Sequence, residues 1–158
     1  MANTQSMCTS FMGELLTATH NFGTAPTRAS SAADTFRGAL YLTTATIDAA
    51  TTVYSATGEV TGTGYSAGGV VVTNATPPTA TNASSTAGVA YWTPSASLTY
   101  TSVTLTTAFD AVLIYNSTQS DKAVSVHTFG SQTITAGTFT LTMPSNTTST
   151  ALLRLATT

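Results

Sequence analysis

The chain has 158 residues, of which 38 are threonine, whereas only four are Lys or Arg and six are Asp or Glu. With a formal net charge of −2 and scattered cations, it has no basic surface of the kind that binds nucleic acid, and no apolar run is long enough for a transmembrane helix. Threonine is β-branched and favours pleated surfaces. The composition therefore predicts a β-sheet protein with a nearly neutral, hydroxyl-rich exterior.

The length predicts a single domain covering residues 1–158. Residues 1–8 are polar and form either an ordered segment or a flexible arm. No basic segment followed by an apolar one begins the chain, and the single cysteine, Cys8, cannot form an intrachain disulfide. Both features favour synthesis in a reducing cytoplasm.

Residues 9–22 carry the only helical pattern, in which Phe11 and Leu15 repeat at helical spacing before Gly23 and Pro26. From residue 34 onward the period changes to two, and 36–42 is predicted as a strand. Residues 43–58 read as irregular, with a short strand near Val53. Four glycines between 62 and 69 indicate bends or a close approach of another backbone. A strand is then predicted at 70–72 and a long loop at 76–87.

The second half of the chain is more regular. Strands are predicted at 89–92, ended by Pro94, and at 98–107 and 111–115. A polar turn at 116–121 precedes a strand at 124–128, and another strand at 138–143 ends at Pro144. A last strand covers 151–155. About eight short strands with turns between them predict an all-β fold over residues 34–156: an antiparallel, jelly-roll-like β-sandwich with one short N-terminal helix.

No catalytic pattern is found among the titratable residues. Only two histidines are present, His20 and His127, and the carboxylates are dispersed without a paired motif. Cys8 and two distant histidines match no zinc spacing. Gly62 and Gly64 precede a strand rather than the helix that a dinucleotide site requires. The sequence therefore predicts a protein that is not an enzyme, with no cofactor and no metal.

Aromatic side chains supply the candidate contact residues. Tyr91 and Trp92 point to opposite faces if their segment is a strand, so one of them is expected in the core. Such aromatics serve either as carbohydrate platforms or as protein contacts. The residues predicted to form an interface are Tyr65, Tyr91, Trp92 and His127.

Several segments resemble a group of small virion proteins encoded by tailed bacteriophages, associated with capsid cement or decoration. The resemblance is carried by Ser10-Phe11 to Leu15-Leu16, His20-Asn21-Phe22, the run from Asp34 to Tyr41, the block from Gly58 to Gly69, and Leu113 to Asn116 followed by Lys122-Ala123-Val124. It covers the chain from about residue 8 to its end. Arg37-Gly38 and Asp110-Ala111 depart from the pattern of the group.

The resemblance implies a jelly-roll protein that binds the outside of an icosahedral head and stabilises the contacts between capsomers. The implied partners are the major capsid protein and further copies of the chain, as a dimer or trimer. The implied location is the capsid exterior of the virion, after synthesis in the host cytoplasm. An alternative is a tail, collar or head-fibre component that binds host-surface glycans.

Overall fold

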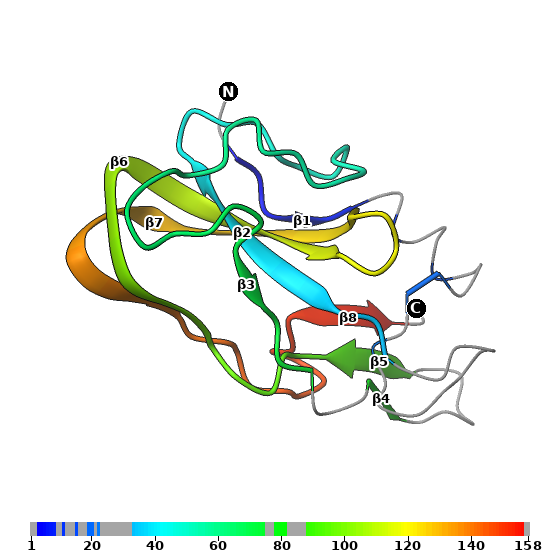
Figure 1. Ribbon diagram of the computed structural model, residues 1–158. Coiled ribbons are helices and arrows are strands. Elements are labelled where there is room, and N and C mark those ends of the chain that lie inside the picture. Colours follow the sequence, from blue (N-terminus) through cyan, green and yellow to red (C-terminus); the bar gives the residue numbers. More distant parts are fainter. Residues whose placement is uncertain are drawn as a thin grey trace. The chain divides into compact units, whose positions relative to one another are not determined.

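The computed structural model describes residues 3–8, 11, 15, 19–20, 22, 33–74, 78–81 and 88–156. Contacts within the chain divide it into two compact units (Figure 1). Unit 1 contains residues 1–20, 34–72 and 98–140, and unit 2 contains residues 21–33, 73–97 and 141–158. Because the chain passes from one unit to the other five times, neither unit is a continuous segment, and the prediction of one domain stays a prediction.

Both units are built on antiparallel sheets, which confirms the all-β class. In unit 1 the strand order is β1-β7-β6-β2-β3, and in unit 2 it is β4-β5-β8. The strands are β1 (Ser6–Met7), β2 (Phe36–Leu42), β3 (Val70–Val71), β4 (Thr79–Thr81), β5 (Val89–Trp92), β6 (Leu98–Asn116), β7 (Lys122–Leu141) and β8 (Leu153–Ala156). The jelly-roll connection of these strands stays a prediction.

The main correction to the expected strands concerns β6 and β7. Where four short strands were predicted, the chain forms two strands of 19 and 20 residues joined by the turn at 117–121. The predicted strand near Val53 is reduced to a single bridge with Lys122. The predicted loop at 76–87 contains the short strand β4. Most of the predicted helix at 9–22 lies outside the described residues, although Phe11 and Leu15 are helical.

The two long strands curve back on themselves as one ribbon (Figure 1). Phe129 and Phe139 are ten residues apart on β7, which in a straight strand would separate them by about 33 Å. Their ring centroids are 5.3 Å apart, and both rings contact Phe109 of β6. Left-handed backbone at Ser102 and Ala136, one in each strand, is typical of bulges that bend a ribbon. The bend thus encloses an aromatic core.

Strand β2 lies between β6 and β3 in the sheet of unit 1, and five of its seven residues are buried. It pairs with β6 from Phe36↔Asn116 to Leu42↔Phe109, and with β3 at Arg37↔Val71. Backbone hydrogen bonds from Leu42 to Gly58 and from Val60 to Leu40 place the segment at 58–69 against the edge of this strand.

Candidate functional site

The most organised polar site of unit 1 is a buried carboxylate surrounded by tyrosines. Glu59 is 5% exposed, and its backbone forms an isolated antiparallel β-bridge with Tyr41 of β2. Its Oε2 accepts a hydrogen bond from the hydroxyl of Tyr54 at 2.6 Å, and its Oε1 accepts from the hydroxyl of Tyr65 at 2.7 Å and from the N–H of Gly68 at 2.8 Å. Hydrogen bonds to a charged group are the stronger kind, and burial without them would be costly. Three donors therefore compensate the buried charge.

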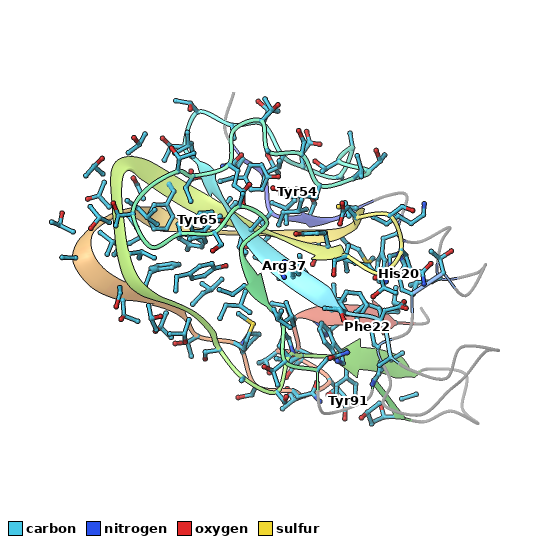
Figure 2. All side chains as sticks on the ribbon, viewed as in Figure 1. His20, Phe22, Arg37, Tyr54, Tyr65 and Tyr91 are labelled. Carbon is cyan, nitrogen blue, oxygen red and sulfur yellow. The ribbon has the colours of Figure 1, made fainter. Side chains whose placement is uncertain are left out.

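A second layer of hydrogen bonds ties the same segment to β2 and β6. Figure 2 labels the side chains of Arg37, Tyr54 and Tyr65. The hydroxyl of Tyr65 accepts from the N–H of Leu40 at 3.0 Å, and that of Tyr115 donates to the carbonyl of Gly68 at 2.9 Å. Arg37 donates to the carbonyls of Gly68 and Gly69 at 3.1 and 2.6 Å. Because these bonds join three separate stretches of chain, they fix the position of the segment at 58–69. We call Glu59, Tyr54, Tyr65, Tyr115 and Arg37 the tyrosine–glutamate cluster.

Ring stacking adds to the cluster. The rings of Tyr54 and Tyr115 are stacked with centroids 4.6 Å apart, and Tyr65 stacks on Tyr100 at 5.9 Å. Desolvation, reinforced by the hydrogen bond and charge of Glu59, raises the pKa of Tyr54 and Tyr65 above the usual tyrosine range. These phenols stay protonated and act as donors, which is the role that the carboxylate requires.

The glycines of this segment allow the backbone to lie against the sheet, as predicted. A Cβ on Gly69 would lie 1.7 Å from the carbonyl oxygen of Gly38, and one on Gly62 would lie 2.0 Å from that of Thr104. Gly69 also has a left-handed φ of 68°. Any side chain at these positions would force the segment away from β2 and β6.

A second buried polar group connects Asp34, Asn116 and His20. The side-chain amide nitrogen of Asn116 donates to Asp34 at 2.8 Å and lies 3.0 Å from Nδ1 of His20. Its oxygen accepts the N–H groups of Thr118 and Gln119 in the turn at 117–121. The imidazole packs edge-on against Phe11 at 4.9 Å. This group therefore stabilises the turn at 117–121.

The predicted interface residues fall into different environments. The assignment of Trp92 to an interface is corrected, because its indole is 2% exposed and packs on Phe22 with centroids 4.7 Å apart. Tyr65 belongs to the tyrosine–glutamate cluster, where its hydroxyl has a donor and an acceptor. Tyr91 is half-buried on β5, which confirms that only one of the Tyr91–Trp92 pair lies in the core. Its interface role stays a prediction.

His127 is half-buried on β7 and forms a hydrogen bond with Ser125, whose Oγ is 2.8 Å from Nε2. Desolvation lowers the pKa of the imidazole to about 4. The ring is therefore neutral near pH 7. An interface role for His127 also stays a prediction.

A depression of about 440 Å³ lies beside the cluster, between the backbone at 44–47 and at 51–58. Threonine hydroxyls and apolar side chains line it, and Tyr41 is the titratable residue among them. The hydroxyl of Tyr41 donates to the carbonyl of Ser55, and burial raises its pKa to about 12. The depression offers hydrogen-bonding groups but no general base.

Within residues 3–8, 33–74, 78–81, 88–156 and the few described positions between them, no three His, Cys, Asp or Glu side chains are grouped closely enough to hold a metal ion. The same part of the chain has no helix long and apolar enough to cross a membrane. Comparisons with protein-family models, curated proteins and solved structures found no match.

Sequence reasoning did not identify the tyrosine–glutamate cluster. Its members are spread from residue 37 to residue 115, and none stands in a recognisable motif. The available signal was indirect: the lone Glu59 lies in a glycine-rich block that is otherwise uncharged. A carboxylate in such a block is a candidate for internal hydrogen bonding.

Proposed function

We propose that the chain is a structural virion protein, a capsid cement or decoration protein that binds the outside of an icosahedral head and stabilises the contacts between capsomers. The observation that carries this proposal is that the buried polar side chains form hydrogen bonds within the chain. Glu59, Asp34 and Asn116 are buried and hydrogen-bonded within the chain, where they hold segments in place. A protein whose task is to present a fixed surface benefits from such internal bonding.

The exterior of the long ribbon supports the same proposal. No Lys, Arg, Asp or Glu occurs between Lys122 and Arg154. A surface of hydroxyls limits nonspecific electrostatic adhesion of a particle that displays it in many copies. Exposed threonines of β6 and β7 are Thr99, Thr101, Thr106, Thr107, Thr133, Thr135, Thr138 and Thr140.

Binding to an assembled shell but not to free subunits would stabilise the shell by mass action. Repetition over many equivalent sites makes a modest contact sufficient. The resemblance of the segments around Asp34–Tyr41 and Gly58–Gly69 to virion proteins of tailed bacteriophages supports this class of function. The proposed partner is the major capsid protein.

The copy number of the chain in gradient-purified virions tests the proposal, measured by quantitative mass spectrometry against the major capsid protein. A simple ratio to the shell subunit is the expected result. A few copies per particle would instead assign the chain to the tail, collar or head fibres, and absence from the particle would overturn a virion role.

A further inference from the structure

Strand β7 has an outer edge that is covered only at its beginning. Strand β1 pairs with it at Met7↔Ser125 and Ser6↔Val126, and Cys8 donates to the carbonyl of Val124. Strand β7 then continues to Leu141. Among the residues that the structure describes, no strand other than β1 and β6 is a neighbour of β7. Within the described part of the chain, the outer edge therefore has no strand partner beyond Thr128.

Strand geometry fixes which backbone groups this edge presents. In an antiparallel pair, every second residue directs both its N–H and its C=O to the partner strand. The carbonyl of Val124 points to β1, so alternation directs the backbone groups of Gly130, Gln132 and Ile134 to the same side. There the carbonyl of Gly130 accepts a hydrogen bond from the side-chain amide of Gln132 at 3.0 Å, which a facing strand would replace. The run ends at Ala136, whose left-handed φ of 46° interrupts it and whose N–H is bonded to Thr104 of β6.

The edge lacks the usual features that prevent strands from pairing between molecules. Natural edge strands are blocked by charged residues, by proline or by short length. Between residues 128 and 136 there is neither a charge nor a proline, and residues 130–133 and 135 are exposed. Ala136, which has a left-handed φ of 46°, lies at the far end of this stretch.

Gly130 provides an independent observation. A Cβ built on it would meet no atom within 4 Å, and its backbone is not left-handed. Neither packing nor conformation within the chain therefore requires glycine there. Glycine within a strand weakens it, and often marks a place where another backbone approaches closely.

We infer that the β7 edge from Thr128 to Ile134 pairs with the same edge of a second copy of this chain, antiparallel and about a two-fold axis. In an antiparallel pair about a two-fold axis, the residues near the axis face their own equivalents, so a charge there would meet a like charge. The uncharged sequence of this edge is suited to that arrangement, and Gly130 leaves room for the facing strand. This inference does not depend on a virion role.

The oligomeric state of the purified full-length chain tests it, by sedimentation velocity over a range of concentrations. We expect a dimer at concentrations around 100 μM. Gln132→Lys places a charge on the edge, and we expect it to raise the dimer dissociation constant at least about tenfold. Thr106→Lys is the matched control, since it adds the same charge at an exposed position of β6, and it should leave the dissociation constant unchanged.

Gln132→Pro is a second variant that removes the outward N–H while leaving the ladder to β6 intact, because proline is tolerated on a free edge. It should give a folded monomer by circular dichroism. Hydrogen exchange of wild type should show the amides of Gly130, Gln132 and Ile134 more protected at high than at low concentration. A monomeric wild type would overturn the inference. So would a dimer that persists in both folded Gln132 variants, because that dimer would use another surface.

Discussion

The hydroxyl of Tyr65 donates to Oε1 of Glu59 at 2.7 Å and accepts the N–H of Leu40 at 3.0 Å. One phenol thus connects a buried carboxylate in the glycine-rich segment to strand β2. The carboxylate is distant in sequence from Leu40, and the phenol supplies one donor and one acceptor. The position of the segment therefore depends on a small number of strong hydrogen bonds.

Glu59→Gln should lower the free energy of unfolding by about 2–4 kcal/mol. The amide group loses the negative charge and places an N–H₂ donor where Tyr54 or Tyr65 already donates. Urea unfolding at neutral pH measures the change. Asp121→Asn is the matched control, because it removes one negative charge in a turn where the left-handed φ of 57° suits asparagine. Equal stability of the two variants would contradict the assigned role of Glu59.

Tyr65→Phe should destabilise the chain by about 1–3 kcal/mol, because it removes one of the three donors to Glu59 and leaves the N–H of Leu40 without its acceptor. Tyr91→Phe removes a hydroxyl from a half-buried tyrosine on β5, and we expect a change within about 0.5 kcal/mol. Thermal and urea unfolding of both variants give the comparison. A larger effect at Tyr91 than at Tyr65 would be inconsistent with the hydrogen bonds of the cluster.

Alkaline pH should destabilise the fold through its buried tyrosines. Burial raises the pKa of Tyr41 to about 12, and the pKa of Tyr65 and Tyr100 is also raised. Above pH 10 the unfolded chain loses phenolic protons that the folded chain keeps, so the free energy of unfolding falls as the pH rises. Absorbance of tyrosinate at pH near 11 should be lower in native than in denatured protein. Equal absorbance in the two states would refute this prediction.

Acid should destabilise the fold through His127. Its pKa falls to about 4 on folding, whereas the unfolded ring binds a proton near pH 6.5. Between these values the unfolded state binds more protons, so the free energy of unfolding falls as the pH falls through this window. Because the ring is partly exposed, we expect a loss of about 1–2 kcal/mol rather than the full value of about 3 kcal/mol.

The measurement is urea unfolding of wild type and His127→Gln at neutral pH and near pH 5. The variant should lose less stability than wild type over this interval, because it has no imidazole to protonate. Identical losses would assign the acid sensitivity to other groups.

Gly69→Ala should destabilise the chain by at least about 2 kcal/mol. The added Cβ would lie 1.7 Å from the carbonyl oxygen of Gly38, and the left-handed backbone adds strain. Gly130→Ala is the matched control, since its Cβ would meet no atom of the chain. Its stability should be measured at a concentration where the chain is monomeric. A tolerated alanine at Gly69 would show that the glycine-rich segment does not lie against β2.

The amino-acid sequence by itself determined the all-β class and most strand positions. Alternation with a period of two placed β2, the alternating Val89 and Tyr91 placed β5, and Asn116 to Asp121 placed the turn between β6 and β7. Pro94 ended the strand that precedes it. These features are local, because side-chain branching, alternation and turn chemistry act over a few residues.

Only the tertiary structure decided how distant residues meet. Each pair of predicted short strands is one long strand in the structure, β6 or β7. The two long strands are hydrogen-bonded neighbours, and this pairing continues through residues that are polar or bent. Trp92 became a core residue through its contact with Phe22. Glu59 forms hydrogen bonds with Tyr54, Tyr65 and Gly68 because the segment at 58–69 lies against β2. Contacts of this kind depend on strand register and on the path of the chain, which no local pattern encodes.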